Sequence, residues 1–343
     1  MVWHGYLYSA DTAFLQKYFP VMEEVFRFYS NITTLNEKGT YDVFHERGRG
    51  QDEASSTAGN LINLLCASYS AEYTTRKYLE AANLLEWGDS VLMDRAKDML
   101  NRGFARKDLL NERGYYVTYE GDDRGPRTQK HPVQLNPIAY LPMPDLVYPD
   151  SPVETAWEHR FDLTRDAHKP LTLGWTIGEF ALASCRMQSP AALEKDLRAI
   201  QPCRAADPRW IQFYESSFWE GWHLMKSYYF PMMGLYMQTF TDAIVQDWEG
   251  HVNVFGCLLP EWKDKEITFH GIHTLQGACI SGTYRQGSGE IEIRIQTSGR
   301  LPFRLGLEDR VMKVRGKKTR GRFVSGKIHQ FDVEAGETVH ISF

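Results

Sequence analysis

The chain has 343 residues, and its formal net charge of −5 argues against a globally basic nucleic-acid binder. Hydrophobic residues make up 43% and charged residues 24%, which is typical of a globular protein with a sizeable core and excludes a disordered, collagen-like or coiled-coil chain. The mean hydropathy is −0.44 and the sequence holds no apolar run of about 18 residues, so no membrane-spanning helix is expected. This length predicts one large domain or two of ordinary size.

The N-terminal part is predicted to be helical. Apolar residues recur at spacings of three and four over 14–29, which indicates an amphipathic helix with Asp11 as its N-cap. A second long helix is expected from about Ser56 to about Leu85, and a third over 89–100, opened by Asp89. The N-terminus lacks the regions of a signal peptide, so we expect no export signal in these residues, and a periplasmic or secreted location would need an upstream segment.

The middle of the chain is expected to alternate between loops and helices. Residues 111–150 are rich in proline and predict short strand-like or irregular pieces. Further helices are predicted over 152–163, 173–187, 190–200 and 232–247.

The pattern changes after Gly250. Residues 251–255, 290–295 and 338–343 alternate between apolar and polar, which is typical of half-buried strands, and glycines punctuate the intervening turns. The sequence therefore predicts a helical domain over 1–250 and an all-β domain over 251–343.

One loop concentrates groups that could carry chemistry. The segment 41–53 holds Glu46, Asp52 and Glu53 between two predicted helices, and neighbouring carboxylates or burial can raise the pKa of an acid that must donate a proton. The alternative is a solvated loop whose acids cap helices. A second candidate acid, Glu215, lies in the aromatic-rich stretch 210–229, where the alternative is an ion pair with Arg209.

Two further segments hold side chains suited to binding. Trp175 opens a predicted helix, where the alternative role is packing between helices. His131, Gln134 and Asn136 lie beside rigid prolines; amides both donate and accept hydrogen bonds, which matches a vicinal diol, whereas the alternative for Asn136 is ordinary turn chemistry.

Several other site types lack support. The five cysteines form no CxxC pair, the eleven histidines form no HExxH or HxH motif, and no glycine-rich phosphate loop or GxSxG elbow occurs. The segment 310–327 carries eight Lys or Arg residues, which is most typical of a solvated edge strand, with polyanion binding as the alternative. The aromatic content of 13% is typical of a large core, but also of a cleft in which rings stack on sugar faces.

Four segments follow one another in a family-specific order. They are YLYSADTAFL at 6–15 with YFPVMEE at 18–24, the stretch 131–142, GWT at 174–176 with ALASCRM at 181–187, and VQDWEG at 245–250 followed by LLPEW at 258–262 and FHGI at 269–272. Together they resemble the C-terminal two-thirds of the (α/α)6-barrel glycoside hydrolases, most closely the inverting α-L-fucosidase group (glycoside hydrolase family 95-like). The resemblance implies a six-hairpin helical toroid, incomplete at its N-terminus, followed by a small β-sandwich.

The resemblance also implies an activity. In inverting glycosidases one carboxylic acid protonates the leaving oxygen and a second carboxylate activates water. Glu46 then becomes the expected acid and Glu215 the second carboxylate. Substrate contacts are expected from Trp175, His131, Gln134, Asn136, Asp52 and Glu53. The expected partner is an oligosaccharide or polysaccharide, with no metal, cofactor, nucleic acid or membrane.

Two departures from the family pattern accompany these expectations. The position of the family's base-orienting aspartate falls on Met233, which cannot perform that role. The chain also begins at what resembles the middle helices of the barrel. We therefore expect a glycosidase, and the alternative is a fragment of a longer glycosidase or a non-catalytic carbohydrate-binding remnant.

Overall fold

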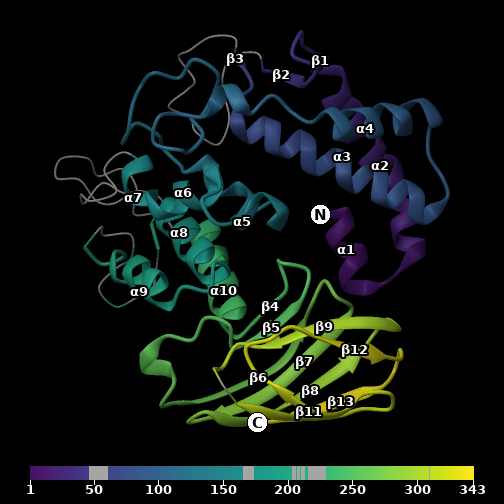
Figure 1. The fold of residues 1–343 in the computed structure, drawn as a ribbon, viewed down its shortest axis with the longest axis vertical. Helices are drawn as coiled ribbons and strands as arrows, with labels where there is room; N and C mark the ends of the chain where they lie inside the picture. The colour runs from purple at the N-terminus through teal and green to yellow at the C-terminus, as the bar shows by residue number, and fades with distance from the viewer. Residues whose placement is uncertain are drawn as a thin grey trace.

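The computed structural model describes residues 1–45, 61–164, 174–202, 206, 209, 213–214, 229–308 and 310–343. Helices dominate the part before residue 245, and strands dominate the part that follows (Figure 1). In the described residues, no helix combines the length and apolar character needed to cross a lipid bilayer.

The first helices form where the sequence pattern places them. Asp11 accepts a 3.0 Å hydrogen bond from the Phe14 amide, and Asp89 accepts one of 2.9 Å from the Val91 amide, so both predicted N-caps are confirmed. A stacked ring pair, Phe26 on Tyr78 with centroids 4.6 Å apart, joins the second helix to the third. The four helices are α1 (Val2–Ser9), α2 (Thr12–Asn31), α3 (Leu65–Leu85) and α4 (Ser90–Arg102).

A small antiparallel sheet precedes α3, and the helix predicted from Ser56 was wrong at its start. Within the described residues α3 begins at Leu65, because residues 61–62 pair with a neighbouring strand instead. Asn63 adopts a left-handed φ of 57°, and its side-chain oxygen accepts a hydrogen bond from the Val43 amide. The strands are β1 (Thr33–Leu35), β2 (Tyr41–His45) and β3 (Leu61–Ile62).

The central helices pack around α8, which is buried along most of its length. A buried ion pair holds this packing, since Arg160 Nε donates to Asp196 Oδ1 at 2.9 Å and Ser184 also donates to Asp196. The elements are η3 (Lys107–Leu109), η4 (Val133–Leu135), α5 (Asn136–Ala139), η5 (Pro144–Leu146), α6 (Pro152–Glu158), α7 (Arg160–Leu163), α8 (Gly174–Arg186), α9 (Pro190–Arg198) and α10 (Phe230–Ile244).

The helix predicted to reach Asp247 ends three residues earlier. Val245 has extended backbone and pairs with Val254, because the chain turns at this point into a sheet. The strands are β4 (Val245–Gln246), β5 (Val252–Val254), β6 (Glu266–His273), β7 (Ala278–Arg285), β8 (Ser288–Ile295), β9 (Gly299–Leu305), β10 (Val311–Arg315), β11 (Arg320–Val324), β12 (His329–Val333) and β13 (Thr338–Ser342), with η6 (Pro260–Trp262) between β5 and β6.

These strands form two sheets that share one hydrophobic core. The six-stranded sheet has the order β11-β10-β13-β8-β7-β6, and the four-stranded sheet has the order β12-β9-β5-β4. Ile280 and Ile293 from the first sheet and Val254 and Phe303 from the second belong to the same buried cluster. The basic strand β11 lies at an edge of its sheet, as the sequence predicted.

The structure therefore combines helices with several antiparallel sheets, which confirms the predicted fold class at that level. The six-hairpin toroid, incomplete at its N-terminus, the sandwich domain and the boundary at Gly250 stay predictions.

Candidate functional site

A cavity of about 400 Å³ lies where α1, α5, α8 and α10 approach β4 of the four-stranded sheet and the end of β6 of the six-stranded sheet. Its wall combines aromatic rings with carboxylates, amides and an arginine. The lining includes His4, Tyr8, Tyr140, Trp175, Arg186, Gln238, Asp242, Gln246, Asp247, Trp248, His273 and Leu275.

Trp175 is one of the aromatic residues that line this cavity. It lies in the first turn of α8, is half-buried, and sits among three other rings: the centroids of Tyr140, His131 and Tyr229 lie 5.7, 5.9 and 6.3 Å from its own. Gly178, one turn later, allows α8 to approach α10 closely, because a Cβ there would lie 3.0 Å from Leu235. The packing thus holds the indole at the cavity wall.

Arg186 ties three of the helices of the cavity together, α5, α8 and α10. Its Nε donates to Asp242 Oδ2 on α10 at 2.7 Å, and its Nη1 donates to the carbonyls of Ile138 and Ala139 at 2.7 and 2.9 Å. Gln238 also donates to Asp242, at 2.5 Å. Both partners of the ion pair are largely buried, so the geometry is fixed by charge as well as by packing.

Asp247 gives the cavity a group that titrates near neutral pH. Burial raises the pKa of its carboxyl to about 6, and the negative charge of Asp242 adds to the rise. Opposing contributions come from Arg186 and from a hydrogen bond that the Leu275 amide donates to Asp247. A carboxyl with this pKa is able both to give and to take a proton near pH 6.

Glu179 is a second unusual acid. It lies one turn after Trp175 on α8 and has no exposed surface. Burial raises the pKa of Glu179 well above its usual range, and a polar contact with Trp175 opposes that rise. The raised pKa favours the protonated form of Glu179, which can donate a hydrogen bond.

His4, which lines the cavity from α1, is held in the neutral state. Its Nε2 and the Tyr73 hydroxyl share a hydrogen bond of 2.7 Å. Burial lowers the pKa of His4 to about 4, with the positive charges of the N-terminus and Lys77 contributing. The imidazole thus adds hydrogen-bonding capacity without charge.

Of the residues predicted from the sequence, Trp175 alone lines this cavity among those that the structure describes. Glu46, Asp52, Glu53 and Glu215 lie outside the described residues, so their catalytic and binding roles stay predictions.

The other three predicted residues are buried but do not line this cavity. His131 contacts the Trp175 ring, and its Nδ1 is 3.1 Å from the Thr176 hydroxyl. Gln134 is fully buried and donates to the carbonyl of Tyr116 at 2.7 Å. Asn136 is 4% exposed, and its Oδ1 has no hydrogen-bond partner among the described residues. His131 thus supports Trp175, whereas Gln134 holds the backbone of the preceding loop.

Sequence reasoning missed the ionisable residues that line the cavity and the buried acid Glu179 on the same helix as Trp175. Glu179 carried a usable signal, since an acid in the otherwise apolar stretch of α8 is unusual and predicts either a partner or a raised pKa. Arg186, Asp242 and Asp247 carried none, because each resembles an ordinary residue near a helix end. The cavity also offers no metal site: no group of three or more potential ligands occurs in the ranges the structure describes.

Comparisons with known proteins gave no matching family model and no matching curated protein. Solved structures do match. A putative kojibiose phosphorylase from the human microbiome superimposes with a TM-score of 0.58 at 9% identity, covering 97% of this chain and 48% of that one. An α-L-rhamnosidase from Dictyoglumus thermophilum gives a TM-score of 0.52 at 12% identity, covering 99% of this chain and 38% of that one.

These similarities show a shared fold. The matched structures are carbohydrate-active enzymes with the six-hairpin glycosidase fold, which agrees with the coarse resemblance found in the sequence. This chain spans half or less of the length of each. The finer resemblance to the α-L-fucosidase group stays a prediction.

Proposed function

We propose that this chain is a glycoside hydrolase, or a part of one, that cleaves a glycosidic bond in a complex glycan by acid–base catalysis with inversion. The observation that carries the proposal is the cavity beside Trp175, which combines a ring surface with buried polar groups. Aromatic faces stack on the C–H faces of sugars, and paired donors and acceptors match their hydroxyls. The shared fold with a phosphorylase and a rhamnosidase supports the same substrate class.

In this proposal Glu46 donates a proton to the leaving oxygen and Glu215 activates the attacking water. In an inverting mechanism the two carboxyl groups stand about 6.5–9.5 Å apart, which leaves room for the attacking water between the base and the sugar. Asp52 and Glu53 contribute substrate contacts from the same segment as Glu46. Trp175 forms the sugar platform and His131 orients it.

A non-catalytic carbohydrate-binding role is the second candidate. One observation favours it: Met233, at the position expected for the family's base-orienting aspartate, is half-buried in the first turn of α10. Its neighbours Pro231 and Gly234 line the cavity, and neither carries a proton acceptor. This candidate keeps sugar binding at Trp175 and predicts no turnover.

Product release from a panel of oligosaccharides and polysaccharides tests both candidates. The variants are Glu46→Gln, Trp175→Ala and, as a matched control at an exposed position, Glu37→Gln. We expect turnover in the wild type and in Glu37→Gln, with a loss of about 100-fold or more in Glu46→Gln because general acid catalysis contributes that much. Sugar binding should survive in Glu46→Gln and weaken in Trp175→Ala.

The other outcomes are equally informative. Turnover that is unaffected in Glu46→Gln would refute the assignment of the acid and direct attention to Glu53 and Glu215. Saturable sugar binding without turnover in any form of the protein, abolished in Trp175→Ala, would establish the binding role instead. Thermal unfolding of each variant verifies that a loss does not come from misfolding.

A further inference from the structure

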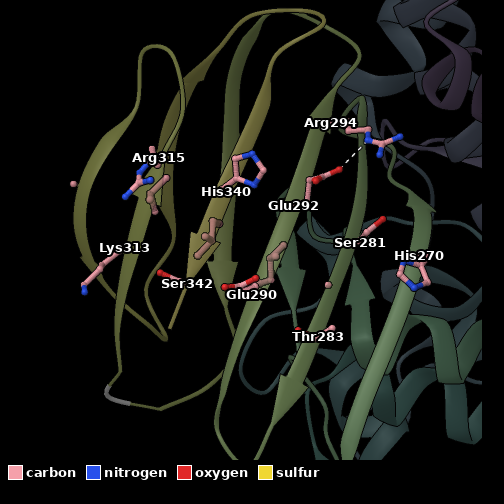
Figure 2. Close-up of a pocket in the computed structure, with 15 residues that line it drawn as sticks. His270, Ser281, Thr283, Glu290, Glu292, Arg294, Lys313, Arg315, His340 and Ser342 are labelled. Carbon is pink, nitrogen blue, oxygen red and sulfur yellow. Dashed lines mark hydrogen bonds and ion pairs between the residues drawn. The ribbon is translucent and has the colours of Figure 1, made fainter.

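A second hollow, of about 790 Å³, lies on the outer face of the six-stranded sheet (Figure 2). It is remote in sequence from Trp175. Polar and charged side chains of five strands line it. They include His270, Ser281, Thr283, Glu290, Glu292, Arg294, Lys313, Arg315, His340 and Ser342.

The strand periodicity explains why these side chains share one face. In β10, Met312 and Val314 are buried while Lys313 and Arg315 are exposed, and β13 and β8 alternate in the same way. Successive side chains of a strand point to opposite sides of the sheet. One side therefore contributes isoleucines and valines to the core, and the side chains that point to the other side, toward the hollow, are mostly polar or charged.

The register arranges the polar groups in two rows across the sheet. One row runs Arg315, His340, Glu292 and Ser281 through directly paired positions. The parallel row runs Lys313, Ser342, Glu290 and Thr283. Each row thus passes from a cation through a hydrogen-bonding group to a carboxylate and a hydroxyl (Figure 2).

Strand β13 keeps the opposite charges of each row apart. Because β10 and β8 flank it, the cations and carboxylates are separated by two strand spacings, about 10 Å. Lys313, Arg315 and Glu290 have no ion-pair partner within the ranges that the structure describes, whereas Glu292 accepts from Arg294 at 2.9 Å. The hollow therefore holds uncompensated positive and negative groups, with hydroxyls and an imidazole between them.

We propose that this hollow binds an acidic oligosaccharide, one whose sugar units carry carboxylates. A ligand carboxylate pairs with Lys313 and Arg315, and sugar hydroxyls donate to Glu290 and Glu292. Ser342 and Thr283 complete the contacts. The inference goes beyond the cavity at Trp175 and shares with the proposed function only the choice of a carbohydrate.

The two signs of charge select this class over other ligands. A neutral glycan would leave Lys313 and Arg315 without a partner. Nucleic acid would bring phosphates against Glu290 and Glu292, and none of the lining residues is Trp, Tyr or Phe, on which bases usually stack. The volume lies within the range of about 300–1,000 Å³ that is typical of ligand pockets.

Calorimetric titration of the full chain tests the proposal, with oligogalacturonate as the acidic probe and its methyl ester as the neutral one. We expect the ester to bind at least about tenfold more weakly, because the loss of one charge-assisted hydrogen bond lowers the affinity by about that factor. Lys313→Gln/Arg315→Gln should lose a similar factor. Lys317→Gln/Lys327→Gln removes the same charge at exposed positions of the turns around β11 and should bind as the wild type does.

Glu290→Gln separates a sugar site from a simple basic patch. Replacing the charged hydroxyl acceptor by a neutral amide should weaken oligogalacturonate binding about fivefold, because a hydrogen bond to a charged group is the stronger one, whereas a patch that merely attracts polyanions would bind more tightly once a negative charge is removed. Tighter binding of oligogalacturonate to Glu290→Gln than to the wild type would overturn the proposal. So would a loss of affinity in Lys317→Gln/Lys327→Gln equal to that in Lys313→Gln/Arg315→Gln, or an affinity of the wild type for duplex DNA equal to that for oligogalacturonate.

Trp175→Ala separates this site from the cavity. Unchanged oligogalacturonate affinity in that variant supports the hollow, even if the chain turns over no glycan at all. Affinity lost in Trp175→Ala but retained in Lys313→Gln/Arg315→Gln would place the acidic glycan in the cavity, which would refute the hollow and leave the proposed function intact.

Discussion

Replacing Asp247 by Asn changes how stability depends on pH. Asp247 lines the cavity directly after β4, and burial raises the pKa of its carboxyl from an ordinary 3.8 to about 6. Asn has nearly the same shape as the protonated acid, and its side-chain oxygen can still accept the hydrogen bond from the Leu275 amide. The substitution therefore removes the ionisation and preserves the packing.

The magnitude follows from the difference between the two pKa values. Below pH 4 the carboxyl is protonated in the folded chain, and the burial penalty is absent. As the pH rises through 6, the folded protein must hold a buried charge that the unfolded chain keeps in water, so stability falls. The pKa rises from 3.8 to about 6, and each pKa unit is worth about 1.4 kcal/mol. Between about pH 4 and pH 8 the free energy of unfolding of the wild type should therefore fall by about 3 kcal/mol relative to that of Asp247→Asn.

Urea unfolding of both proteins over this pH range measures the effect. Other groups that titrate in the same interval, such as the buried Asp196, are common to both proteins and cancel in the difference. Asp264→Asn, at an exposed position of the same part of the chain, serves as the matched control. A constant difference across the pH range would refute the raised pKa of Asp247. A difference of the opposite sign would show that Arg186 outweighs burial.

Three further substitutions test the fold. Asp89→Ala removes the cap of α4 and should lower the free energy of unfolding by about 1 kcal/mol; no change in a urea titration would contradict the capping role. Arg160→Ala removes the ion-pair partner of the buried Asp196, which keeps only the hydrogen bond from Ser184, and should cost about 3–5 kcal/mol. The double variant with Asp196→Asn should recover part of this loss. Gly289→Ala would place a Cβ 2.1 Å from the carbonyl oxygen of Thr283, so the β7–β8 pair would have to shift. The free energy of unfolding should fall by about 1–3 kcal/mol, measured as a lower midpoint in urea. An unchanged midpoint would mean that the hairpin adjusts freely.

Local patterns predicted the regular elements well. The spacing of apolar residues in α2 and the caps Asp11 and Asp89 depend on neighbours within one or two turns, so the sequence carries them directly. The errors fall where a distant strand competes with a helix. Residues 61–62 pair with β2, and Val245 pairs with Val254, although both segments have helical periodicity.

The candidate site was predicted only in part, and the reason is distance along the chain. Trp175 could be identified because a Trp at a predicted helix start is a local feature of the sequence. The neighbours that give the cavity its chemistry come from elsewhere: Arg186 meets Asp242 across 56 positions, and Leu275 meets Asp247 across 28. Only the packing of α8 against α10 and the sheet brings them together.

The sequence by itself determined the helices, the alternating strands and the polar face of the six-stranded sheet, because all of these follow from side-chain periodicity over a few residues. The tertiary structure decided which charges meet. Burial raises the pKa of Asp247 and Glu179, and strand order holds Lys313 away from Glu290. Both effects depend on what surrounds a side chain in space, since desolvation and Coulomb interactions act through space and not along the chain.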